Sequence, residues 1–71
     1  MSTEVKSPIP GKIVEILVNV GDQVAEDEEI IVMEAMKMKN PVYSTAAGSV
    51  QEIKVKEGEE VNEDQVLVVL G

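Results

Sequence analysis

Lysine is the residue with the clearest capacity for chemistry in this chain. Histidine and cysteine are both absent, which excludes disulfides, thiolate metal sites and the commonest general base at neutral pH. Lys37 lies between two methionines in the run Glu34-Ala35-Met36-Lys37-Met38. A lysine amine can be acylated, but it is almost fully protonated at neutral pH because the ordinary pKa of the side chain is about 10.4. The driving force for acylation must therefore come from another source.

The composition is that of a small β-protein. A chain of 71 residues has room for one domain with one small core, which leaves little space for a conventional enzyme with a deep substrate pocket. The sequence contains 13 valines and six isoleucines but no phenylalanine or tryptophan. Because β-branched side chains suit a pleated, half-buried surface, we expect a compact all-β domain.

The net charge of −8 narrows the range of partners. Phosphate backbones and anionic lipids would be repelled, so we expect neither nucleic acid nor a membrane surface as a partner. No apolar stretch approaches the roughly 20 residues that cross a bilayer, and the first residues do not resemble a secretory signal. We expect a cytoplasmic protein that is monomeric in isolation.

The sequence repeats itself with an offset of 37 residues. Residues 11–24 align with residues 48–61 without a gap, and the match continues from Glu26-Asp27 to Glu63-Asp64. Two copies cannot build a solenoid. The repeat therefore predicts two interlocked halves, about residues 5–34 and 42–71, related by an approximate two-fold axis and preceded by a tail of residues 1–4.

Strands with turns at fixed places are expected in each half. The apolar positions that the halves share are Ile13/Val50, Ile16/Ile53, Val18/Val55 and Val24/Val61. The step of three from Ile13 to Ile16 breaks the alternation of a strand and predicts a bulge. Gly21-Asp22 and Gly58-Glu59 predict tight turns, because glycine tolerates a positive φ. We expect about eight short strands in two small sheets.

The segment of residues 35–41 joins the halves and has no repeat partner. Strands on either side of it predict a hairpin with Met36-Lys37 at its tip. By the same symmetry, the chain near Val5 and the chain near Leu70 are expected at the opposite pole.

These motifs resemble the biotin attachment domain of the biotin carboxyl carrier family. Residues 34–38 are similar to its attachment motif, and Ser7-Pro8-Ile9-Pro10-Gly11 is similar to its Ala-Pro-Met-Pro-Gly element. Gly21-Asp22-Gln23-Val24 and residues 56–61 resemble its two turn motifs. The departures are Ser7, Ile9 and Lys39, and the insertion that forms a protruding thumb in some carriers is absent.

The resemblance implies a flattened β-barrel, or barrel-sandwich hybrid, of two four-stranded antiparallel sheets. It implies that Lys37 carries covalent biotin, attached by a separate biotin ligase, and that Ala35, Met36 and Met38 complete the attachment motif. The partners that it implies are biotin carboxylase and carboxyltransferase or decarboxylase subunits of an acyl-CoA carboxylase, transcarboxylase or decarboxylase. The domain would catalyse nothing alone.

Three alternatives remain open at this point. A lipoyl domain of a 2-oxo acid dehydrogenase complex shares the fold, although its lysine usually follows aspartate. An unmodified interaction module would leave Lys37 as an ordinary turn residue. A metal or hydrolytic site could use the acidic runs of residues 26–29 and 59–60, but their spacing matches no calcium loop and such runs are usually solvated.

Overall fold

Strands make up all of the regular structure in the computed structural model, which describes residues 2–71. Those residues contain no helix and hence none that could cross a membrane. The strands are β1 (Thr3–Lys6), β2 (Gly11–Ile16), β3 (Gln23–Val24), β4 (Glu29–Ala35), β5 (Met38–Tyr43), β6 (Gly48–Ile53), β7 (Glu60–Val61) and β8 (Val66–Leu70). β1 includes Thr3 and Glu4, which the sequence assigned to a tail, because Thr3 pairs with Leu70. Met1 of that tail lies outside the described residues.

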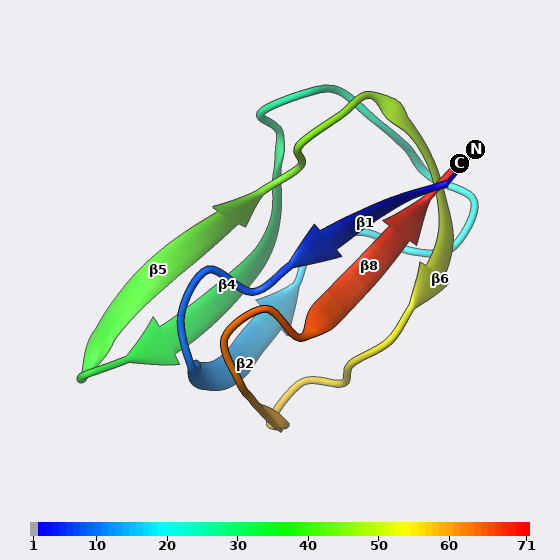
Figure 1. Cartoon of the computed structure of the whole chain (residues 1–71). Helices are drawn as coiled ribbons and strands as arrows, with labels where there is room; N and C mark the ends of the chain where they lie inside the picture. The colour runs from blue at the N-terminus through cyan, green and yellow to red at the C-terminus, as the bar shows by residue number, and fades with distance from the viewer. Residues whose placement is uncertain (1) are drawn as a thin grey trace.

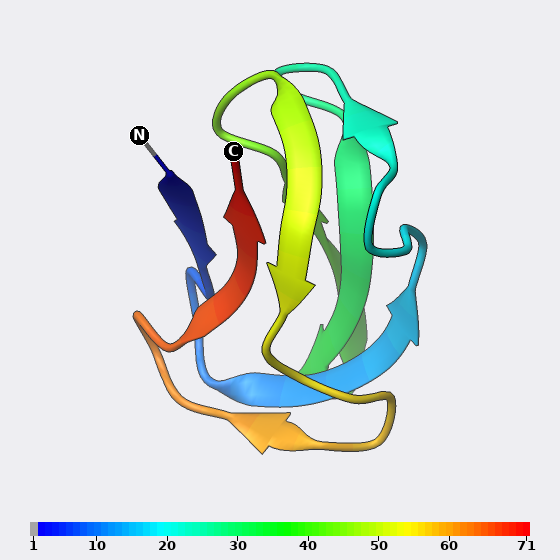
Figure 2. The same cartoon turned by 90° about the vertical axis from the view of Figure 1, so that its right-hand side faces the viewer.

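The strands form two four-stranded antiparallel sheets, as the sequence predicted. One sheet has the order β1-β8-β6-β3 and the other has the order β5-β4-β2-β7. Each sheet combines two strands from the first half of the chain with two from the second. Figures 1 and 2 show the two sheets folded over each other. The two halves are therefore interlocked, and neither forms a sheet by itself.

The predicted irregularities occur at equivalent places in both halves. The register of β2 with β4 shifts between Ile13 and Glu15, and that of β6 with β8 shifts between Val50 and Glu52. These bulges turn Ile13 and Val50 inward despite the broken alternation. Gly21 and Gly58 have φ values of 98° and 89°, which glycine adopts at little cost.

Every buried hydrophobic residue of the core has a counterpart 37 residues away in the other half. The 14 buried hydrophobic residues form seven pairs related by that offset. The pairs are Val5/Val42, Ile13/Val50, Val18/Val55, Val24/Val61, Ile30/Leu67, Ile31/Val68 and Met33/Leu70. Because each half supplies one member of every pair, the apolar packing that stabilises the domain is shared equally between the halves.

Two buried serines extend the symmetry to polar groups. Ser7 and Ser44 are each at most 1% exposed, and their hydroxyls donate to the carbonyl oxygens of Ile9 and Ala46. The backbone oxygen of each serine accepts from the opposite half, Ser44 from the Asp27 amide and Ser7 from the Asp64 amide, both at 2.8 Å. These bonds satisfy buried polar groups that would otherwise destabilise the fold.

The two ends of the elongated molecule differ in what they expose. The principal extents are 33 × 17 × 17 Å. Both chain ends lie together at one end of the molecule, where β1 pairs with β8, and the turn between β4 and β5 projects at the other (Figure 1). The structure thus has the two poles that the repeat predicted.

Candidate functional site

The β4–β5 hairpin determines the conformation of Met36 and Lys37. Its strands are paired from Glu29–Tyr43 to Ala35–Met38, so Met36 and Lys37 are the only two residues of the loop. Their φ values are 55° and 65°. Positive φ at both central residues is typical of a type I′ turn, whose twist matches that of the flanking strands. Lys37 is therefore held in a narrow backbone geometry at the tip of a projecting hairpin.

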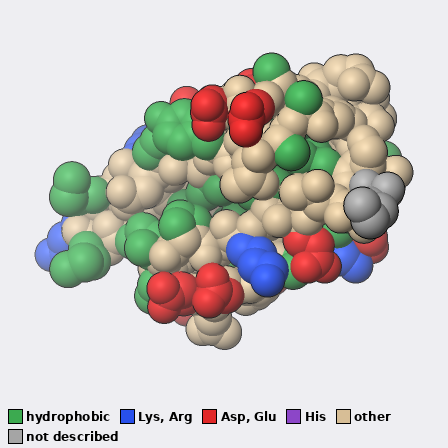
Figure 3. All heavy atoms as spheres, turned by 45° about the horizontal axis from the view of Figure 1, so that its top comes forward, with side chains coloured by type: hydrophobic (Ala, Val, Ile, Leu, Met, Phe, Trp, Pro, Cys, Tyr) green, Lys and Arg blue, Asp and Glu red, His purple; other side chains and the backbone are tan. Residues whose placement is uncertain are grey.

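The residues around Lys37 are strongly exposed. Met36 and Met38 have 95% and 67% of their surface exposed, and Lys37 is also exposed. Met33 on the same hairpin is fully buried, so it belongs to the core. Figure 3 shows hydrophobic and basic side chains together at the end of the molecule where the hairpin projects. Methionine side chains are flexible and polarizable, which suits contact with more than one partner surface.

The other lysines lie in different backbone settings. Lys39 belongs to β5 and is opposite Glu34 in the cross-strand register. Lys6 and Lys12 are also strand residues, whereas Lys54 forms an ion pair of 2.9 Å with Glu52. Among the lysines, which all lie within residues 2–71, Lys37 is the one with a positive φ. The conformation thus distinguishes Lys37 from Lys39, its nearest competitor.

The tip conformation is expected to cost stability. An L-residue with a side chain is disfavoured by about 1 kcal/mol or more in the left-handed region, whereas glycine is not. We therefore expect the Lys37→Gly variant to be about 1 kcal/mol more stable than the Lys37→Ala variant. Both variants lack the amine, so urea denaturation of the pair isolates the backbone contribution. Equal stabilities would mean that the turn relaxes at no cost.

A covalently attached cofactor fits the residues at the tip. The amine of Lys37 lies on an exposed turn, and in the described part of the chain its side chain has no ion-pair partner. Among residues 2–71, no three carboxylates come together as a metal site would require. Several acidic residues instead bind turn amides: Asp22 accepts from the Asn19 amide at 2.8 Å, and Glu28 from the Ala25 amide at 2.9 Å.

Comparison with known proteins identifies the family. The model of the biotin/lipoyl family, described as "Biotin-requiring enzyme", matches residues 3–70 of the 71. The chain belongs to this family. Biotin is the cofactor that the family description names, and the domain resembles the biotin-carrier domains of biotin-dependent carboxylases.

The curated relatives of this biotin/lipoyl-family domain are longer chains that it matches over part of their length. It is 50% identical over 44 residues to the mitochondrial propionyl-CoA carboxylase alpha chain of Caenorhabditis elegans, a match that covers 62% of this chain and 6% of that one. It is 46% identical over 41 residues to the biotin carboxyl carrier protein of Streptococcus mutans, covering 58% of this chain and 32% of the relative. The chain thus corresponds to a small part of these proteins.

Solved carboxylase structures contain the same fold. The Kluyveromyces lactis urea carboxylase matches all of this chain, with a TM-score of 0.93 and 28% identity, over 6% of its own length. A single-chain, multi-domain long-chain acyl-CoA carboxylase matches 96% of this chain and 7% of its own, with a TM-score of 0.88 and 24% identity. The second likeness concerns the fold alone.

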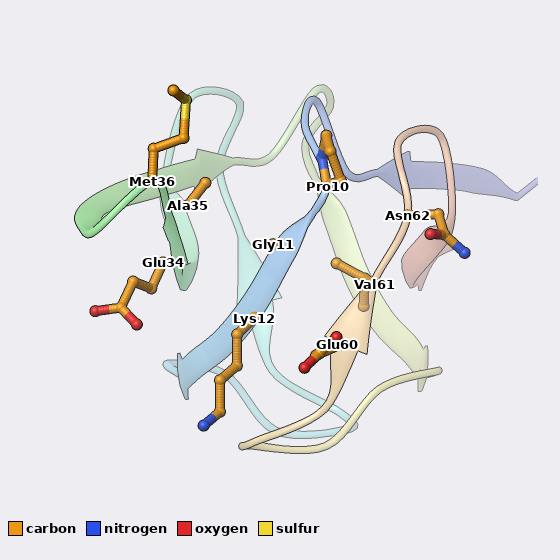
Figure 4. A pocket seen from close by; sticks show the side chains of 9 residues that line it. All are labelled: Pro10, Gly11, Lys12, Glu34, Ala35, Met36, Glu60, Val61 and Asn62. Atoms are coloured by element: carbon orange, nitrogen blue, oxygen red, sulfur yellow. The ribbon is translucent and has the colours of Figure 1, made fainter.

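A groove beside the hairpin was not predicted from the sequence. It lies between the end of β4 and β7, with Gly11 between them (Figure 4). The sequence places Glu60 in a turn motif and in an acidic run, and it marks neither Lys12 nor Asn62. No local pattern marks these residues, because the pairing of β2 with β7 brings them to the hairpin.

Proposed function

We propose that Lys37 is the residue that carries biotin, and that the domain moves this cofactor between the active sites of a biotin-dependent carboxylase, decarboxylase or transcarboxylase. The observation that carries the proposal is the position of an exposed lysine at the tip of a two-residue hairpin in a member of the biotin/lipoyl family. Ala35, Met36 and Met38 would complete the surface on which the amine is recognised.

The chemistry required of Lys37 is the formation of one amide bond. A biotin ligase would present the cofactor as an acyl-adenylate. The free amine of Lys37 attacks the acyl carbon, AMP leaves with the electrons of the broken bond, and the extra proton of the amine passes to solvent. The protein supplies the fixed position of the amine, and it needs no general base of its own because the acyl group arrives activated.

Bound biotin supplies a ureido nitrogen that accepts and releases a carboxyl group. The remaining work of the chain is transport, because an extended lysine–biotin arm reaches only roughly 12 Å. Sites that lie further apart require movement of the whole domain. The two poles favour such movement, because a linker joined to either chain end would leave the hairpin unobstructed. Tethering also raises the effective concentration of the cofactor at each site.

Two reactions test the proposal in sequence. Incubation with biotin, ATP and biotin ligase should make the domain reactive to streptavidin, and a lipoyl ligase with lipoate should leave it unmodified. The biotinylated domain should then take up label from radioactive bicarbonate when a biotin carboxylase subunit and ATP are added. Modification by the lipoyl ligase alone would overturn the assignment of the cofactor, and absence of label would overturn a role as the acceptor of carboxyl groups from biotin carboxylase.

A further inference from the structure

The groove beside the hairpin has a volume of about 600 Å³. Gly11 lies between its two sides, because β2 pairs with β4 along one edge and with β7 along the other. A Cβ atom at Gly11 would lie 2.5 Å from the carbonyl oxygen of Glu34, so the close approach of these strands requires glycine. Figure 4 shows the end of β4 on one side and β7 on the other. The lining residues are Pro10, Gly11, Lys12, Glu34, Ala35, Met36, Glu60, Val61 and Asn62.

The polar residues that line the groove differ from their counterparts in the other half of the repeat, whereas Gly11 and Val61 are the same in both halves. Gly11 and Val61 correspond to Gly48 and Val24 in the other half. The four polar residues have different counterparts: Lys12 corresponds to Ser49, Glu34 to Gly71, Glu60 to Gln23 and Asn62 to Ala25. Because the other half adopts the same strands without these side chains, the fold does not require them. Their presence at the hairpin pole calls for another explanation.

The charges in the groove are available for a ligand. Lys12 lies between Glu34 and Glu60 in the cross-strand register, and all three side chains are exposed. Within residues 2–71 the ion pair that forms is Lys54–Glu52, so neither carboxylate holds the ammonium of Lys12 in a salt bridge. The groove therefore offers hydrogen-bond donors from Lys12 and Asn62 and two carboxylate acceptors.

We propose that this groove binds the ureido ring of biotin carried by Lys37 of the same chain. The inference rests on the proposed function. A ureido group has one carbonyl oxygen, which would accept from Lys12 or Asn62, and two N–H groups, which would donate to Glu34 or Glu60. Pro10 and Met36, which are both exposed, supply apolar surface for the rest of the ring. The lining therefore offers hydrogen-bond donors for the carbonyl oxygen of the ring and acceptors for its two N–H groups.

Tethering makes a shallow groove sufficient for binding. Met36, which precedes Lys37 in the chain, itself lines the groove, and the arm of roughly 12 Å can fold back along the hairpin. A ligand on a short flexible tether has an effective concentration in the millimolar range. A millimolar dissociation constant would then leave the ring docked about half of the time. Such weak binding holds the ring during movement of the domain and releases it to an active site.

Amide NMR spectra of the biotinylated and unmodified domains test the inference. Mass spectrometry first verifies that each sample is fully modified, so a failure of biotinylation is seen separately. Docking should shift the amide signals of Gly11, Val61 and Asn62 as well as those of the tip, and should give nuclear Overhauser contacts between the ring and the exposed Pro10 side chain. Shifts restricted to residues 35–38 would overturn the proposal.

The repeat itself provides matched variants. Glu60→Gln and Asn62→Ala introduce the residues that already occupy the equivalent positions 23 and 25, so the fold should tolerate both. Together they should reduce the groove shifts at least about twofold. The reciprocal variants Gln23→Glu and Ala25→Asn, at the opposite pole, should leave the shifts unchanged. Equal groove shifts in all of these proteins would show that the polar lining does not bind the ring.

Discussion

Replacing Lys37 with arginine is expected to abolish biotinylation, whereas replacing Lys39 with arginine should leave the rate nearly unchanged. Both variants keep the charge, and both positions are exposed. Arginine lacks the nucleophilic primary amine. The proposed site therefore predicts opposite outcomes for two lysines that are separated by one residue.

The hairpin geometry explains why Lys39 should not substitute for Lys37. Lys37 lies in the two-residue turn, and Lys39 lies on β5 opposite Glu34. Two residues along a strand displace an amine by roughly 7 Å, whereas reacting atoms must approach to about 3 Å. Because a misplacement of about 1 Å can lower a rate by about 10²-fold, we expect the Lys37→Arg variant to react at least 10²-fold more slowly.

Streptavidin blotting over a time course with biotin ligase measures these rates. Peptide mass spectrometry of the wild-type protein should place the modification on Lys37. The unfolding midpoints of the two variants provide the control, because both should remain folded. Labelling of Lys39 in the Lys37→Arg variant at a rate similar to that of the wild type would contradict the site assignment.

A second large effect is expected from the core residue Ile13. Its side chain is fully buried, and truncation of a buried isoleucine to alanine costs about 2–5 kcal/mol. At about 0.05–0.15 kcal/mol per residue, a domain of this size has a total stability of roughly 4–10 kcal/mol. The Ile13→Ala variant should therefore lose about 3 kcal/mol, which leaves a free energy of unfolding of roughly 1–7 kcal/mol.

The neighbouring residue Val14 is the matched control. It belongs to the same strand but has 37% of its surface exposed, so Val14→Ala should change the stability by no more than about 0.5 kcal/mol. Urea denaturation followed by circular dichroism measures both variants. A loss of less than about 1 kcal/mol in Ile13→Ala would contradict this expectation. It would mean that the surrounding side chains collapse into the space left by the truncation, although both halves contribute residues to the core around Ile13.

The internal repeat explains why much of the fold was predictable. Ile13 and Val50 fall three residues before Ile16 and Ile53, and this spacing alone located both bulges. Gly21 and Gly58 marked turns because a positive φ is inexpensive for glycine. The burial of the Ser7 and Ser44 hydroxyls was not predicted. Serine is usually exposed, and nothing in the local sequence distinguishes a buried serine from an exposed one.

The conformation of the tip and the groove depended on information that the local sequence does not contain. Type I′ turns favour Asn-Gly or Gly-Gly, so Met36-Lys37 carries no propensity signal for its left-handed backbone. The strand register, rather than composition, imposes it. Glu60 and Asn62 reach the hairpin only through the pairing of β7 with β2, a contact between residues about 50 apart in the chain. Such contacts cannot be derived from periodicity within one strand.

The two-pole arrangement makes the domain a lever. If a linker at the chain ends acts as the pivot, the rigid beam is the 33 Å long axis of the molecule, and the lysine–biotin arm adds roughly 12 Å beyond it. The cofactor ring would then sweep a sphere with a radius of roughly 45 Å. A modest rotation at the pivot is thus amplified into a large displacement at the ring. The elongated shape of the barrel therefore contributes more to the reach of the cofactor than the flexible arm does.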